Sequence, residues 1–111
     1  MTTLDPAAGH LVLINTFAVE PSRAEELLAV LSRATETGMR HRPGFVSASL
    51  HISDDKRHVA NYAQWRSHED LDAMMKDPAA GIHMREAAGI ATSFTPIYYE
   101  LRETHSAAPS G

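Results

Sequence analysis

The segment His58–Ser67, which reads HVANYAQWRS, limits the possible folds of this chain more than any other stretch. It is an apolar run between a charged turn at residues 53–57 and a helix-start signal at residues 67–70, and this context predicts a β-strand. Because side chains alternate along a strand, one face carries Val59, Asn61, Ala63 and Trp65. An amide and the chain's single tryptophan therefore lie on a face that should be buried. Either an internal network or a ligand in a pocket must satisfy their polar groups.

The periodicity of the remaining chain completes an α+β pattern. Alternating apolar residues predict further strands at residues 11–19, 45–52 and 93–102. Apolar residues three and four apart predict a helix over residues 22–40, which Ser22 and Glu25 open with capping-box spacing. Ser67 and Asp77-Pro78 open two shorter helices that end near residues 76 and 89. The order strand, helix, strand, strand, helix, strand is that of a ferredoxin-like βαββαβ fold, with a four-stranded antiparallel sheet and its helices on one face.

The predicted domain occupies residues 11–103. The segment 1–10 is short, rich in small residues and includes Pro6 and Gly9, so we expect a loosely held N-terminal arm. Residues 104–111 form a small-residue tail that we expect to be disordered.

The second face of the predicted sheet has no helix to cover it. The apolar residues that we expect there are Val12, Ile14, Val46, Ala48 and Leu50. Burial of such a face contributes many kcal/mol at about 25 cal/mol per Å². The sequence therefore predicts a homodimer in which two sheets pack face to face.

The hairpin at residues 53–57 sets the pairing of the two central strands. A turn centred near Asp55 places Ser49 opposite Asn61 and His51 opposite Val59. His51, Ser49 and Asn61 then share one face, and a shift of one residue would separate them.

Composition excludes several classes of function. The chain has 111 residues and a net charge of −4, so it lacks the basic surface that binds nucleic acid. It has no cysteine, which excludes thiolate catalysis, disulfides and cysteine-ligated metal centres. No apolar run approaches the roughly 20 residues that span a bilayer, and no signal segment opens the chain, so we expect no membrane partner and a cytoplasmic location. The histidines show no metal-binding spacing on a helix, so we expect no metal.

Four motifs together resemble the antibiotic biosynthesis monooxygenase family. They are Asn15-Thr16-Phe17, Pro43-Gly44-Phe45, residues 61–67 (NYAQWRS) and residues 84–87 (MREA). The resemblance covers about residues 11–102 and is nearest to the small oxygenases of aromatic polyketide pathways. It implies a dimeric α+β barrel that oxidises an anthrone or phenolic polycycle to a quinone with O2, without metal or flavin.

The resemblance also implies site residues. The catalytic residues that it indicates are Asn15, Asn61 and Trp65. The expected substrate contacts are His51, Arg85, Phe17 and Ser49. One position departs from the family pattern, because Leu71 stands where some relatives have a tyrosine that can hydrogen-bond the substrate.

These side chains suit oxidation of a phenol by O2. A deprotonated phenol can pass one electron to O2, and the radical pair can combine to a peroxide that loses water to give a quinone. Asn15 and Asn61 offer amide N–H donors to the developing oxyanion, where one donor contributes ~3 kcal/mol. Trp65 offers a stacking plane, and His51 offers a proton acceptor.

Structural roles and other functions stay open for the same residues. The two asparagines could bond each other in a core, Trp65 could be core, and Arg85 could be a helix-surface residue paired with Glu86 or Asp72. A related oxygenase could need reduced flavin as co-substrate, although the chain has no phosphate-binding glycine loop. A non-catalytic barrel could bind or help cyclise a pathway intermediate. Haem is disfavoured, because Met75 stands where haem-degrading relatives have a histidine.

Overall fold

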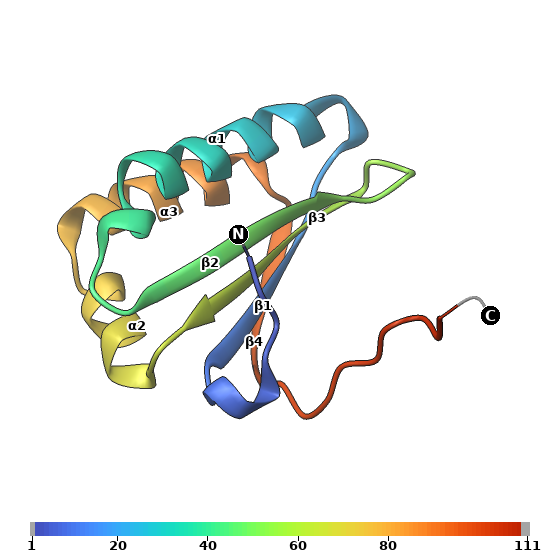
Figure 1. Cartoon of the computed structure of the whole chain (residues 1–111). Helices are drawn as coiled ribbons and strands as arrows, with labels where there is room; N and C mark the ends of the chain where they lie inside the picture. Colours follow the sequence, from blue (N-terminus) through green and yellow to red (C-terminus); the bar gives the residue numbers. More distant parts are fainter. Residues whose placement is uncertain (1, 110–111) are drawn as a thin grey trace.

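The computed structural model describes residues 2–109 and has the ferredoxin-like fold that the sequence predicts (Figure 1). Its strands are β1 Leu11–Ala18, β2 Phe45–Ile52, β3 His58–Trp65 and β4 Ser93–Glu100. Its α-helices are α1 Ala24–Thr37, α2 His68–Met75 and α3 Pro78–Ile90. Three short 3-10 helices are η1 Pro6–Ala8, η2 Pro21–Arg23 and η3 Met39–His41. The sheet is antiparallel in the order β2-β3-β1-β4, and α1 and α3 lie together on one of its faces.

The two predicted caps after β3 are present. The Ser67 hydroxyl accepts a hydrogen bond from the Asp70 backbone N–H at 3.2 Å and opens α2. Asp77 Oδ1 accepts from the Ala79 N–H at 2.9 Å and opens α3, with Pro78 at the first helical position. Both helices therefore begin where side-chain oxygens satisfy free backbone donors.

The predicted start of the first helix is wrong. The chain enters α1 through η2, and Arg23 occupies the N-cap position without a side-chain capping bond. Its guanidinium instead pairs with Glu26, with Nε 3.0 Å from Oε2. Pro21 favours the tight 3-10 turn because its ring fixes φ, so the capping box expected from Ser22 and Glu25 does not form.

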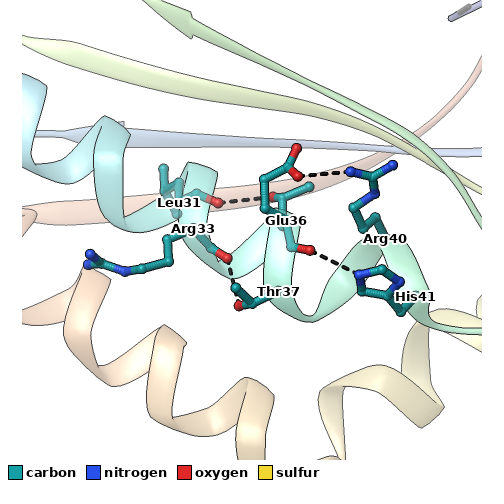
Figure 2. A network of polar contacts seen from close by, with 7 residues as sticks. Leu31, Arg33, Glu36, Thr37, Arg40 and His41 are labelled. Atoms are coloured by element: carbon teal, nitrogen blue, oxygen red, sulfur yellow. Dashed lines mark hydrogen bonds and ion pairs between the residues drawn. The ribbon is translucent and has the colours of Figure 1, made fainter.

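The predicted end of the same helix is three residues too late. In the last turn of α1, side chains form hydrogen bonds with residues four or five positions earlier in the chain. Figure 2 shows this for Thr37, whose hydroxyl donates to the Arg33 carbonyl at 2.7 Å. His41 Nε2 lies 3.0 Å from the Glu36 carbonyl, and Arg40 pairs with the Glu36 carboxylate at 2.8 Å. Gly38 interrupts the helical dihedrals at φ −130°, and η3 follows it.

The predicted register of the β2–β3 hairpin is wrong by one residue. The structure pairs Leu50 with Asn61 and His51 with Ala60. The turn is asymmetric, because the Lys56 N–H donates to the Ser53 carbonyl at 2.9 Å and Lys56 itself has φ of 60°. The centre of the hairpin thus lies between residues 55 and 56. His51 and Ser49 consequently lie on the sheet face opposite to Asn61.

The same turn holds Asp55 in its charged form. The Ser53 hydroxyl donates to Asp55 Oδ1 at 2.7 Å, and the Arg57 backbone N–H donates to the same oxygen at 2.9 Å. These two bonds, the Ser53 bond first, lower the pKa of the Asp55 carboxyl.

The face of the sheet without helices is partly covered by the N-terminal arm. Gln64 is 1% exposed there, and its Nε2 donates to the Thr3 carbonyl at 3.0 Å and to the Ser47 hydroxyl at 2.9 Å. Val12 lies opposite Gln64 and is also buried. Ala48 and Leu50, which we expected on this face, pack instead against the helix-side core, as the corrected register requires.

The chain ends lie partly outside the described residues. Residues 101–109 have no regular secondary structure and leave the body of the domain after β4 (Figure 1). Residue 1 of the predicted arm and residues 110–111 of the predicted tail are outside the described range.

The core between sheet and helices has two parts. The first contains Phe17, Val19 and Val59 from the sheet, packed on Leu27, Val30 and Leu31 of α1 and Ala87 and Ile90 of α3. The second contains Ala63, Trp65, Leu71 and Met74. Asn15 and Asn61 occupy the sheet positions between these two parts.

Candidate active site

Asn15 and Asn61 form a row of two amides beneath the helices. They are direct cross-strand partners on β1 and β3, and their side chains share the face of Phe17 and Val59. Asn15 is 8% exposed. The Oδ1 atoms of both residues are buried and have no hydrogen-bond partner within residues 2–109. The amides therefore do not satisfy each other, which removes the simplest structural explanation for them.

Trp65 follows Asn61 along the same face of β3. Its side chain is 1% exposed and packs edge-on against Phe45, with the ring centroids 5.4 Å apart. Leu71 and Met74 of α2 complete its surroundings. Trp65 is thus part of the core, two strand repeats from the amide row, with Ala63 between them.

A cavity of about 250 Å³ lies between α1, η3 and the two later helices. Most of its wall is apolar and comes from Leu31, Ala34, Gly38, Met39, Met74, Ala79, Ala80 and Met84. Its polar residues are Thr37, Arg42, Asp77 and His83. An apolar pocket with a few polar side chains is the usual form of a small-molecule site, although this one is smaller than the roughly 300–1,000 Å³ typical of drug-sized ligands.

An ion pair crosses one side of the cavity. Arg42 Nη1 donates to Asp77 Oδ2 at 3.0 Å, and each side chain is about 30% exposed. Asp77 thus uses one oxygen to cap α3 and the other to hold Arg42. Arg42 Nε and His83 Nδ1 are buried and without a partner among the described residues.

The floor of the cavity separates it from the amide row. Leu31 belongs to the first part of the core and Met74 to the second, and both line the cavity. On the sheet, the junction of these two parts is the row formed by Asn15 and Asn61. Neither asparagine lines the cavity, so a ligand in it would meet the amides only after part of this floor has moved. Met74 is the adaptable element of this floor, because its unbranched side chain can change rotamer readily.

The other expected substrate contacts lie outside this arrangement. Phe17 shares the amide face, but it is 2% exposed and stacks on Phe94 with ring centroids 5.9 Å apart. His51 and Ser49 lie on the opposite face of the sheet. Arg85 is exposed on α3, near Gly81, and is not among the residues that line the cavity.

Arg85 lies on the helix surface, as its structural alternative requires, but it is not paired with Glu86. Glu86, one of its two expected partners, pairs with Arg33 of α1, with Oε1 3.3 Å from Nη2.

Leu71, at the position of the family tyrosine, is fully buried in the core. That position therefore supplies no polar group to the site.

The polar wall of the cavity was not predicted from the sequence. Asp77 was identified only as a helix cap, and Arg42 carries no local signal because it precedes a turn. His83 could have been found, since Ala80, His83, Met84 and Ala87 have the i, i+3, i+4, i+7 spacing of a buried helix face.

Two further properties bear on partners. None of the helices within residues 2–109 is long and apolar enough to cross a bilayer. In the same part of the chain, no group of three His, Asp or Glu side chains is placed to hold a metal ion.

The chain is similar to known oxygenases in sequence and in fold. The family model for antibiotic biosynthesis monooxygenase matches residues 10–85. Tetracenomycin-F1 monooxygenase from Streptomyces glaucescens is 42% identical over 106 residues, which are 96% of this chain and 92% of that protein.

Two solved structures have the same fold. SnoaB from Streptomyces nogalater, described as a cofactor-independent oxygenase, superposes with a TM-score of 0.77 at 22% identity, over 86% of this chain and 96% of its own. The ActVA-Orf6 monooxygenase from Streptomyces coelicolor, solved in complex with Nanaomycin D, gives a TM-score of 0.74 at 26% identity and covers 96% of both chains.

Proposed function

The chain belongs to the antibiotic biosynthesis monooxygenase family and is a monooxygenase, and we propose that it oxidises an anthrone-type phenolic polyketide to a quinone with O2 and no bound cofactor. The observation that carries this proposal is the pair of amides, Asn15 and Asn61, whose oxygens have no partner within residues 2–109, at a core junction whose members Leu31 and Met74 also line an apolar cavity. A flat apolar substrate with a carbonyl edge fits such a site, because it needs apolar walls and N–H donors at one point.

The proposed reaction balances with O2 as the only oxidant. The phenol loses a proton, and its anion gives one electron to O2. The resulting radical and superoxide combine in a carbon–oxygen bond, which forms a peroxide. Loss of water then converts the CH2 carbon to a carbonyl, so one oxygen atom enters the quinone and the other leaves as water. The protein has to favour the anion and keep bulk water away from the radical pair.

Asn15 and Asn61 have the central role in this proposal. Their Nδ2 groups donate to the substrate carbonyl, which gains negative charge as the anion forms. Trp65, two strand repeats from Asn61 on the same face, contacts the substrate ring once Met74 has moved. Phe17 supports the row from its apolar side. His51, Ser49 and Arg85 have no part in the cavity formed by a single chain.

A homodimer accompanies the proposed activity. The large side chains of β4 remain exposed on both faces of this edge strand, at 44% for Phe94, 45% for Ile97, 48% for Tyr98 and 46% for Tyr99. Exposed apolar surface of this kind favours association with another chain. Packing of a second sheet on the face without helices would bury Ile97 and Tyr99, together with His51 and Ser49.

Oxygen uptake tests the proposed reaction. The purified protein, treated with a chelator and free of flavin, is mixed with 1,8-dihydroxyanthrone in an oxygen electrode. We expect uptake well above the autoxidation rate, with one O2 consumed for each quinone formed. Uptake that requires added reduced flavin would support the flavin-dependent alternative. Tight binding of the anthrone without uptake would support a non-catalytic barrel.

A further inference from the structure

The polar wall of the cavity contains a cation, a carboxylate and an imidazole. Arg42 comes from the segment between η3 and β2, whereas Asp77 is the N-cap of α3 and His83 lies in the first half of that helix. Apart from the Thr37 hydroxyl, the other side chains of the lining are apolar. Any charged or ionisable group on a ligand in this cavity will therefore be governed by these three residues.

Arg42 is oriented and still has donors to offer. Within residues 2–109 its guanidinium makes one hydrogen bond, from Nη1 to Asp77 Oδ2 at 3.0 Å. A guanidinium carries five N–H donors in a fixed plane. Asp77 cannot turn away, because its second oxygen caps the Ala79 N–H. The carboxylate thus fixes the guanidinium on the cavity wall and leaves part of it free for an anionic oxygen.

His83 lies on the same wall. The charged groups that face the cavity with it are Arg42 and Asp77, and the lining residues of α1, η3 and α2 carry no charge. Glu86, one turn further along α3, is engaged with Arg33 on the surface. A neutral imidazole has one ring nitrogen without a proton, so His83 can take a proton from a phenol held beside it.

We propose that Arg42, Asp77 and His83 form a phenolate-binding site, in which His83 accepts the proton of the substrate hydroxyl and Arg42 pairs with the resulting phenolate. The O–H bond breaks and an N–H bond forms on the imidazole, with no change in electron count. Asp77 is a positioning residue that acts through Arg42. The turnover part rests on the proposed function, in which the anion then reduces O2. The imidazole proton is available to the peroxide oxygen that leaves as water.

Such a site also defines the substrate. The hydroxyl must stand on an outer ring, away from the carbonyl, as in 2-hydroxyanthrone, so that it faces α3 while the carbonyl reaches toward the amide row. A polycycle that lacks a hydroxyl at that end should bind without being ionised.

A coloured phenol that cannot turn over tests the site directly. The probe is 2-hydroxyanthraquinone, which is already oxidised and whose visible absorption reports its ionisation. Bound to the wild-type protein, its ionisation midpoint should fall by about 1–3 pH units, as expected for an acid beside a fixed opposite charge. Arg42→Met should abolish the fall. Arg40→Met is the matched control, because Arg40 pairs with Glu36 on the surface and does not line the cavity.

The role of Asp77 is tested by a double-mutant cycle with Arg42, which asks whether the effects of the two substitutions on probe binding are additive. Asp77→Asn keeps an acceptor for the Ala79 N–H but removes the charge that holds Arg42. We expect it to weaken probe binding in the wild-type background and to have no further effect in the Arg42→Met background. Equal effects in both backgrounds would contradict a role through Arg42. A wild-type protein that fails to bind the probe, or binds it with an unchanged midpoint, overturns the proposal whatever the variants do.

Turnover tests His83. With 2-hydroxyanthrone as the substrate, His83→Gln should lower kcat near neutral pH by about 100-fold or more, the usual contribution of a general base, and raising the pH should restore the rate as the substrate ionises in solution. An unchanged pH profile in the folded variant would remove His83 from the site. Probe ionisation without oxygen uptake by the wild type would leave the phenolate site in place and contradict the proposed oxygenase function alone.

Discussion

Asn15 and Asn61 lie directly opposite each other on β1 and β3, and neither side-chain oxygen has a hydrogen-bond partner within residues 2–109. A buried polar group without a partner costs about 1–3 kcal/mol. The apolar positions on either side, Phe17 with Val59 and Leu13 with Ala63, show that this sheet face could hold an apolar pair. A ligand that donates a hydroxyl hydrogen to these oxygens, and accepts from the Nδ2 groups through its carbonyl, would recover this free energy.

Replacement of one amide should not destabilise the fold. Asn61→Leu keeps the branched shape and the number of heavy atoms of the side chain and removes a buried acceptor that has no partner within residues 2–109. We expect the free energy of unfolding to stay the same or to rise by about 1 kcal/mol. Urea denaturation measures it. A loss of more than that amount would indicate a structural hydrogen bond from Asn61.

The single tryptophan should report ligand binding. Trp65 is 1% exposed, so its emission should lie at the short wavelengths of an apolar environment. A hydroxyanthraquinone in the cavity should quench it, because Met74 both lines the cavity and packs in the core with Trp65. N-acetyltryptophanamide with the same probe corrects for absorption by the probe. Emission at the wavelength of free tryptophan would contradict the burial of Trp65.

Two glycines should respond in opposite ways to alanine. Gly44 has φ of 83°, and a Cβ there would clash with the Asp70 side chain. Gly44→Ala should therefore destabilise the protein by more than about 1 kcal/mol. Gly89 lies within α3 with nothing near an added Cβ, so Gly89→Ala should stabilise it by roughly 0.5–1 kcal/mol. Thermal melting of both variants tests this pair, and equal shifts would contradict it.

The open face of the sheet should control association. Ile97 lies on that face opposite Ile14 and is 45% exposed, whereas Ile82 of α3 is 58% exposed away from the sheet. We expect the wild type and Ile82→Glu to be dimers by light scattering and Ile97→Glu to be a monomer, because the new charge would be buried between the sheets. A dimeric Ile97→Glu protein would place the interface elsewhere.

Much of the fold could be predicted from the sequence because it follows local rules. Alternation marks the strands, and Ser67 and Asp77 open their helices through bonds to residues two or three positions ahead. The hairpin register depends instead on the left-handed conformation of Lys56. Because Lys56 is not a glycine, its residue type does not predict that conformation. That single difference moved His51 and Ser49 away from the amides.

The candidate site divides in the same way. Asn15 and Asn61 could be placed on one face by strand period and by the family motif. Arg42 and Asp77 are 35 residues apart and meet only because η3 and the start of α3 approach each other across the cavity. The spacing of apolar residues along the sequence does not predict a contact between residues so far apart. The helical spacing of α3 could have placed His83 on a buried face, but only the cavity shows that it lies near Arg42 and Asp77.

The most direct test of the amide row is single-turnover quinone formation from 1,8-dihydroxyanthrone by the wild type, Asn61→Leu and Gln64→Leu. Gln64 is a buried amide on the same strand, but its side chain points to the opposite face and bonds Thr3 and Ser47. We predict that Asn61→Leu slows the reaction about 100-fold or more, the effect of losing an oxyanion donor, while Gln64→Leu retains the wild-type rate per folded molecule. Wild-type turnover by folded Asn61→Leu would contradict a catalytic role for the amide row.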